Sequence, residues 1–324
     1  MTFRFTRDSL SCGAWLAACA PAGLRAVTPI LFGILTMSAI PAHAQDADAA
    51  PPSSVGALDL QAQLHWLQHA ARDGALARLD DAQLVALFAA LDPRTLERYI
   101  AVGPNGYGEY EFTLRHRERV GMRWPATADH LLVRLAHDPL RLYARWLPDG
   151  AHAGQEVLYD AASRPDALYG HAGGVFGLMS IWTPLDGAFA RSQSHHRLTD
   201  LGTEAIARRF LDGFPRLAAA GAAKPSRIAV QTRDGVRVVA LTWVTPSETD
   251  DNASGNASDE TRGNANGPTA ARETLGLDLR HAWFRTVQSY DGAGRPLEDV
   301  VIEHIEPKRF GILTFDARNP DYRF

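Results

Sequence analysis

The sequence predicts an α+β domain in which about three helices accompany an antiparallel sheet of roughly ten strands. Two patterns lead to this fold class. Apolar residues recur at three- and four-residue spacings between residues 58 and 102, which is the period of an α-helix. From Gly108 onward the period is two, as in half-buried strands, and turn-forming Gly, Pro and Asp residues separate the short apolar runs.

A signal for export precedes this domain. Residues 27–40 (VTPILFGILTMSAI) are apolar, follow Arg25 and end in Pro41-Ala42-His43-Ala44, an A-x-A cleavage pattern. The stretch is shorter than the roughly 20 apolar residues of a spanning helix. We therefore predict cleavage after Ala44 and a periplasmic or secreted mature protein, with an uncleaved N-terminal anchor as the alternative.

Both cysteines, Cys12 and Cys19, lie before the predicted cleavage point. The mature protein then has no disulfide, no thiol nucleophile and no cysteine-ligated metal. Leu16-Ala17-Ala18-Cys19 resembles the motif that leaves a lipidated cysteine as the new N-terminus. Lipidation at Cys19 is thus the alternative to cleavage after Ala44.

The mature chain begins with a flexible tether and continues as a single domain, in our prediction residues 45–57 and 58–324. Helices are predicted over Leu58–Leu76 and Asp80–Val102, because the leucines in each gather on one face. A third helix is predicted over Asp200–Ala220, capped by Thr199 or Asp200.

The first strand shows the alternation most clearly, because Tyr110, Phe112 and Leu114 alternate with polar residues and the run continues to Val120. Further strands are predicted over residues 130–137, 140–147, 155–160, 167–171, 177–183, 227–231, 236–244, 282–290, 297–305 and 310–315. Residues 247–274 contain no aromatic residue and no aliphatic residue larger than alanine, so we predict a disordered insertion there.

The composition excludes some functions and leaves others open. A formal net charge of −4 gives no basis for nucleic-acid binding. The sequence lacks a G-x-S-x-G elbow, a phosphate-binding loop and a dinucleotide motif, so we predict no catalytic residue and no cofactor. His65 and His69 have helical metal spacing, but Trp66 stands where a metalloprotease has its glutamate, so no metal site is predicted. A cleft holding Glu118, Glu156 and His171 would favour an enzyme.

Several segments together resemble a bacterial family of exported proteins known only as a domain of unknown function. They include YEFTLRHRERVG at 110–121, DPLRLYARWL at 138–147, GQEVLY at 154–159 and FDARNPDYRF at 315–324. More distantly, the order of elements is similar to periplasmic lipoprotein carriers of the LolA and LppX type. That likeness implies a strongly curved antiparallel sheet, an open half-barrel, that holds acyl chains against helices.

The family resemblance implies no established activity. The more distant likeness to lipoprotein carriers implies a non-enzymatic periplasmic binding protein or carrier for a lipid, a lipoprotein or another amphiphile, with peripheral membrane association open. The alternative is a structural or partner-binding envelope protein whose core is filled by its own side chains. Candidate ligand contacts are Phe112, Leu142 and Trp146 around an apolar chain, Arg117 or Arg197 near its head group, and Tyr143, Glu156 and His171.

Overall fold

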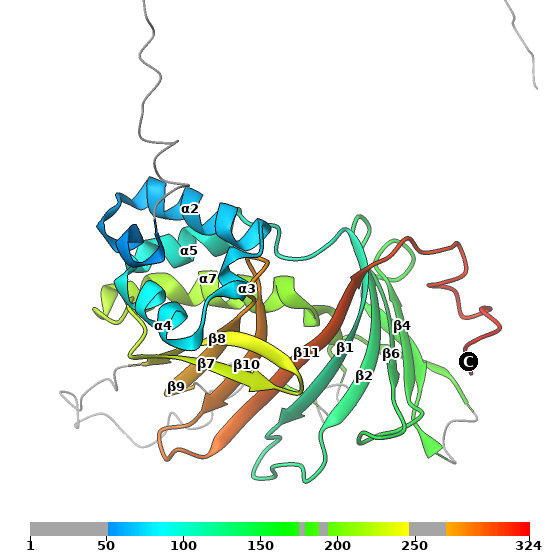
Figure 1. Cartoon of the computed structure of the whole chain (residues 1–324). Helices are drawn as coiled ribbons and strands as arrows, with labels where there is room; N and C mark the ends of the chain where they lie inside the picture. The colour runs from blue at the N-terminus through cyan, green and yellow to red at the C-terminus, as the bar shows by residue number, and fades with distance from the viewer. Residues whose placement is uncertain (1–50, 175–178, 188–193, 246–269) are drawn as a thin grey trace, which may run out of the picture. The chain divides into compact units, whose positions relative to one another are not determined.

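The structure, a computed structural model, describes residues 51–174, 179–187, 194–245 and 270–324 (Figure 1). All of these belong to one of the two units of the chain, residues 41–324. The predicted signal, residues 1–44, lies outside the described residues. Within the described ranges, no helix is long and apolar enough to cross a membrane.

Five α-helices occur in the described residues, together with two short 3-10 helices. They are η1 (Pro52–Ala57), α2 (Leu60–Arg72), α3 (Ala75–Arg78), α4 (Asp81–Ala90), α5 (Pro93–Val102), η3 (Leu198–Asp200) and α7 (Thr203–Ala219). The three predicted helical regions are therefore present but more divided than the apolar spacing indicates. Part of the predicted tether is η1, whose Val55 is fully buried.

Backbone chemistry explains where the helices divide. Gly74 takes a φ of +69°, in the left-handed region that favours glycine, and separates α2 from α3. Asp92 accepts a hydrogen bond from the backbone N–H of Arg94, and Pro93 occupies the first turn of α5. A new helix therefore starts where the apolar spacing alone suggested one continuous helix.

In the part of the chain that the structure describes, eleven strands form one antiparallel sheet that does not close into a barrel. The strands are β1 (Glu109–Glu118), β2 (Asp129–Ala136), β3 (Arg141–Trp146), β4 (Glu156–Asp160), β5 (Ala167–His171), β6 (Ile181–Pro184), β7 (Arg227–Arg233), β8 (Val236–Val244), β9 (Arg272–Leu277), β10 (Phe284–Tyr290) and β11 (Pro296–Pro307). Their order across the sheet is β6-β5-β4-β3-β2-β1-β11-β10-β9-β8-β7. The predicted fold class, an antiparallel α+β domain with an open sheet, is confirmed.

Two predictions about local structure are wrong. The predicted insertion extends into β9, because residues 272–274 pair with both β8 and β10; residues 246–269 lie outside the described residues. No strand forms at Phe310–Phe315, where the chain makes turns before the C-terminal tail. The polar residues at the start of β9 made that strand look like part of the insertion. The aromatic residues Phe310 and Phe315 suggested a strand that does not form.

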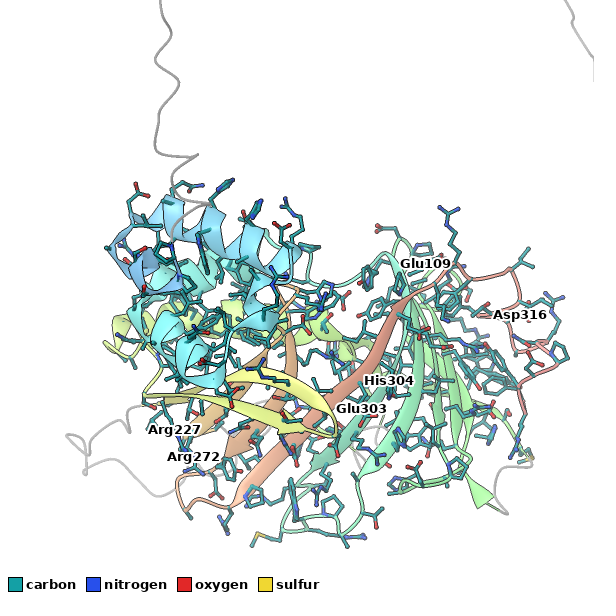
Figure 2. All side chains as sticks on the ribbon, viewed as in Figure 1. Glu109, Arg227, Arg272, Glu303, His304 and Asp316 are labelled. Carbon is teal, nitrogen blue, oxygen red and sulfur yellow. The ribbon has the colours of Figure 1, made fainter. Side chains whose placement is uncertain are left out.

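The sheet has an inner face toward the helices and an outer face away from them. Figure 1 shows α2–α5 and α7 over the β7–β11 half of the sheet, and Figure 2 shows their side chains filling the space between. Phe210 of α7 contacts Trp243 of β8 and Phe284 of β10, with ring centroids 5.4 and 5.1 Å apart. The main hydrophobic core lies on this inner face.

Candidate functional site

The inner face of β1–β5 is an apolar wall. Antiparallel pairing places Phe112 opposite Val133, Val133 opposite Ala144, and Leu142 opposite Tyr159, so these side chains share one face. The buried apolar residues of this wall are Tyr110, Phe112, Leu114, Leu131, Val133, Leu135, Leu142, Ala144, Trp146, Tyr159 and Leu168. Three of the predicted ligand contacts, Phe112, Leu142 and Trp146, thus lie together.

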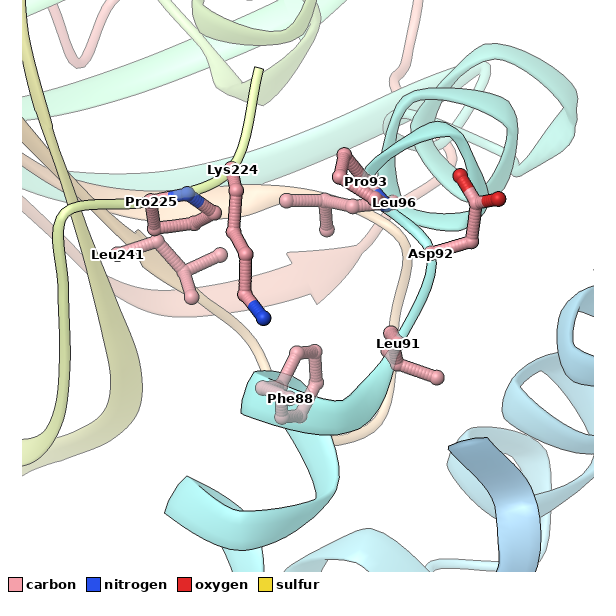
Figure 3. Close-up of a pocket in the computed structure, with 8 residues that line it drawn as sticks. All are labelled: Phe88, Leu91, Asp92, Pro93, Leu96, Lys224, Pro225 and Leu241. Atoms are coloured by element: carbon pink, nitrogen blue, oxygen red, sulfur yellow. The ribbon is translucent and has the colours of Figure 1, made fainter. Parts of the chain in front are cut away.

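Side chains of the protein itself cover this wall. Residues 194–201, here called the cover segment, contribute Leu198 and Leu201, which pack against the main core that includes the wall, and Leu185 is a third partly buried leucine packed against that core. Beneath the helices, an apolar pocket between α4, α5 and β8 has a volume of about 10 Å³ (Figure 3). That volume is at the lower limit for a single water molecule. The wall residues themselves are at most 8% exposed, so the wall is covered rather than open.

A group of charged residues continues the wall past Leu114, and we call it the carboxylate cluster. Its members are Glu118 of β1, His196 of the cover segment, Arg209 of α7, Glu273 of β9 and Glu298 of β11. Glu118 pairs directly with Glu298, and Ser289 of β10 pairs with both Glu298 and Glu273, so the three carboxylates lie on the inner face. Three strands, one helix and the cover segment are needed to assemble the cluster.

Short contacts join these groups. Arg209 Nη1 donates to Glu298 Oε2 at 3.0 Å, and its Nη2 lies 3.7 Å from Glu273 Oε1. His196 Nε2 lies 3.2 Å from Glu298 Oε1 and 3.9 Å from Glu118 Oε1. Glu118 also accepts hydrogen bonds from the Ser194 hydroxyl at 2.5 Å and the His195 backbone N–H at 3.1 Å. Glu118 and Glu298 therefore anchor the cover segment to the sheet.

The environment drives the pKa values of two of the carboxyl groups apart. Burial alone would raise the pKa of Glu298, but the Arg209 charge and the His196 hydrogen bond hold it well below its usual range. Burial raises the pKa of Glu273. Burial opposes protonation of His196, yet its hydrogen bond to Glu298 and the nearby carboxylates raise its pKa. The cluster consequently offers acceptors on Glu298 and donors on Arg209 and His196.

The remaining predicted ligand contacts do not join the inner wall. Tyr143, Glu156 and His171 lie on the outer face, under the C-terminal tail marked by Asp316 in Figure 2. Tyr143 stacks on Tyr322 with ring centroids 3.9 Å apart, and its hydroxyl donates to Glu156 Oε2 at 3.2 Å. Glu118, on the opposite face, is therefore separated from Glu156 and His171.

The two predicted head-group arginines are also elsewhere. Arg117 is on the outer side of β1, where Nη2 lies 3.5 Å from Asp299 Oδ2 and the guanidinium lies over the Trp124 ring. Arg197 makes a double ion pair with Asp186, with N–O distances of 2.7 and 2.8 Å. Both guanidinium groups already face carboxylates of this chain.

Sequence reasoning missed Arg209, Glu273 and Glu298. Alternation of Glu298 with Val300 and Ile302 could have indicated that Glu298 faces inward. No local signal pointed to Arg209, which is one of many arginines, or to Glu273, which falls in the predicted insertion. Among the described residues, no group of three or more His, Cys, Asp or Glu side chains has the arrangement of a metal site.

Comparisons with known proteins give a family and a fold. The model of a family described as "Protein of unknown function (DUF1571)" matches residues 107–324. No curated protein matches the chain. Similar solved structures include an uncharacterized conserved protein from Thermus thermophilus, with 8% identity, a TM-score of 0.35 and coverage of 67% of this chain and 90% of that chain.

Two further similar structures come from other bacteria. A putative outer membrane lipoprotein-sorting protein domain from Vibrio parahaemolyticus has 11% identity, a TM-score of 0.30 and coverage of 69% and 97% of the two chains. The Mycobacterium tuberculosis lipoprotein LppX has 11% identity, a TM-score of 0.35 and coverage of 68% and 96%. These likenesses concern the fold alone.

Proposed function

The chain belongs to the DUF1571 family of proteins of unknown function, and we propose from its geometry that it is an exported, non-enzymatic binding protein for an amphiphile. The ligand's apolar chain would lie on the inner wall of β1–β5, and its polar head at the carboxylate cluster. The protein would act in the periplasm or outside the cell, with peripheral association with the envelope membrane.

One observation carries this proposal: an apolar wall spanning five strands runs into a charged cluster on the same face of the sheet. On β1 the inner face changes from apolar to charged between Leu114 and Glu118, which are two inward-facing positions apart. An amphiphile has the same polarity pattern. The cluster would favour a head group with both donors and acceptors, because Glu298 accepts and Arg209 donates.

A ligand chain could reach the inner wall only if it displaced the cover segment. It contains one short 3-10 helix and otherwise no regular structure, and leucines attach it to the wall. Exposing one buried leucine costs about 1.5–3 kcal/mol, and these leucines are only partly buried. Burying a sixteen-carbon chain contributes about 12 kcal/mol, at about 0.8 kcal/mol per methylene, before association costs. The apolar gain from such a chain exceeds the cost of exposing these leucines, and release of the segment's contacts with Glu118 and Glu298 adds to the cost of the exchange.

Titration of delipidated mature protein with a fluorescent fatty acid tests the proposal. We expect saturable binding below about 100 μM, since burial of the chain alone can exceed the cost of association. The variant Ala144→Leu adds volume at the centre of the wall, where Ala144 is fully buried, and should weaken binding. Ala229→Leu on β7 is the matched control. A folded wild-type protein without saturable binding would overturn the proposal.

A second function is favoured by a different observation. The inner wall is packed by the protein's own leucines, and the apolar pocket beneath the helices holds about 10 Å³. A structural or partner-binding envelope protein needs no more than such a filled core. Absence of saturable fatty-acid binding by the folded wild-type protein would favour this alternative.

A further inference from the structure

We propose that the outer face carries a second site, for a small anion that also bears a hydroxyl group, such as a hydroxy acid or a monoprotonated phosphate. The site is a recess of about 360 Å³ at the open ends of β3, β4 and β5, which we call the outer recess. It is lined by Pro148, Ala153, Gly154, His171, Gly174 and Arg323. Its volume falls within the range of ligand pockets, about 300–1,000 Å³.

His171 lines the recess and carries a candidate acceptor for a ligand. Its side chain is buried, with 6% of the residue surface exposed, and its Nδ1 lies 2.9 Å from the Ala172 carbonyl oxygen. Because a carbonyl oxygen only accepts hydrogen bonds, Nδ1 carries a proton, and the lone pair of the Nδ1–H tautomer is on Nε2. Nε2 is buried and has no hydrogen-bond partner among the described residues.

A buried polar atom without a partner is uncommon, because leaving it unsatisfied costs free energy. The lone pair of Nε2 can accept one hydrogen bond, and the hydroxyl group of a ligand can donate it. His171 is held in place, since its ring packs edge-on against Phe324 with centroids 5.7 Å apart. The acceptor is therefore fixed before a ligand arrives.

Arg323 supplies the positive charge. Its backbone N–H donates to Glu156 Oε2 at 3.2 Å, the oxygen that also accepts from the Tyr143 hydroxyl. Glu156 is only 1% exposed and already accepts these two hydrogen bonds. Its carboxylate does not line the recess. Of the described residues that line the recess, none is a carboxylate, so the exposed Arg323 side chain can pair with an anion.

Two glycines keep the walls short. Gly154 and Gly174 have φ values of +82° and +69°, which L side chains rarely adopt. A Cβ at either position would meet no atom within 4 Å, so both positions border open space. A side chain at either glycine would extend into that space.

His171 and Arg323 together recognise two groups of the ligand, its hydroxyl and its anionic group. The ligand hydroxyl donates its hydrogen to His171 Nε2, while its carboxylate or phosphate oxygens accept from the Arg323 guanidinium. A site that uses a hydroxyl in this way discriminates against the analogue that lacks it. Lactate should therefore bind more tightly than propionate, which differs by that hydroxyl.

The test is a titration of ¹⁵N-histidine-labelled mature protein with lactate, propionate and inorganic phosphate, followed by the imidazole ¹⁵N resonances. We expect lactate and phosphate to shift the His171 Nε2 resonance saturably below about 10 mM, and propionate to bind about tenfold more weakly. The shift reports on the acceptor atom itself, so a change of stability alone does not mimic it.

Variants locate the anion. Arg323→Gln should weaken lactate binding about tenfold, because a charge-assisted hydrogen bond is lost. Arg318→Gln, on the same tail but outside the recess, is the matched control and should bind as the wild type does. His171→Phe keeps an aromatic ring against Phe324 and should abolish the preference for lactate over propionate.

Three results would overturn the proposal: equal binding of lactate and propionate, equal loss in Arg323→Gln and Arg318→Gln, or no shift at His171. Should His171→Phe fail to fold, the Arg323 and Arg318 variants still decide, because both side chains are exposed. The outcome is independent of fatty-acid binding, since the outer recess and the inner wall lie on opposite faces of the sheet.

Discussion

Replacement of Arg209 by methionine tests how the carboxylate cluster is held together. Arg209 Nη1 donates to Glu298 Oε2 at 3.0 Å, and the Glu298 side chain is only 11% exposed. Removing one partner of a buried ion pair costs about 3–5 kcal/mol, because the other charge is left buried. Arg209 keeps 35% of its side chain exposed. Because water screens the pair, we expect a lower loss of unfolding free energy, about 2–3 kcal/mol.

The double variant Arg209→Met with Glu298→Met distinguishes a charge effect from a packing effect. Replacing both partners by apolar side chains removes the unpaired charge, so the double variant should be more stable than Arg209→Met alone. We expect an interaction free energy of at least about 1 kcal/mol in the resulting cycle.

Urea denaturation at pH 7 measures these changes through the midpoint and the m-value. Arg94→Met, which breaks an exposed pair with Asp92, is the control and should leave the midpoint unchanged. An Arg209→Met midpoint equal to that of the wild type would refute the reasoning. Additive losses in the double variant would show that the pair contributes no charge interaction of its own.

Three further predictions concern pH, the insertion and export. Carboxylate partners raise the pKa of His196 above 6.5 despite burial, and the hydrogen bond to Glu204 raises that of His137. Their contribution to stability is therefore complete below pH 6.5 and is lost as pH rises through the folded pKa values. The urea concentration at the unfolding midpoint should decrease as pH rises above 6.5, and Glu298→Gln should make that decrease smaller. Deleting residues 247–269 with a short Gly/Ser joint should leave the melting temperature unchanged within a few degrees, because loop length enters stability logarithmically. Deletion through Thr274 should lower it, because residues 272–274 pair with two strands. N-terminal sequencing of exported protein should begin at Gln45, and an acylated Cys19 in the membrane fraction would contradict this.

Local sequence patterns carried most of the strand prediction. A strand alternates its side chains between two faces, so Tyr110, Phe112 and Leu114 identified both β1 and its buried side. The same rule could have corrected one prediction, because the neighbours Leu142 and Tyr143 cannot both face one ligand. The structure places Leu142 on the inner wall and Tyr143 under the C-terminal tail.

The candidate sites depended on contacts that local patterns do not contain. Glu118 meets Glu298 only because β1 pairs with β11, and Arg209 reaches both Glu298 and Glu273 from a helix that precedes both of them in the sequence. The outer recess likewise requires the tail residue Arg323 to lie beside His171 of β5. In each case the partners are far apart along the chain.

The sequence by itself determined the fold class, the position of most strands and the polarity of each strand's two faces, because these follow from the two-residue and 3.6-residue periods of the backbone. Only the tertiary structure decided which strands are neighbours, what fills the inner wall and which charged groups meet. Strand pairing and its register are set by the packing of whole faces over long sequence separations, and a period within one segment carries no information about the segment that will lie beside it.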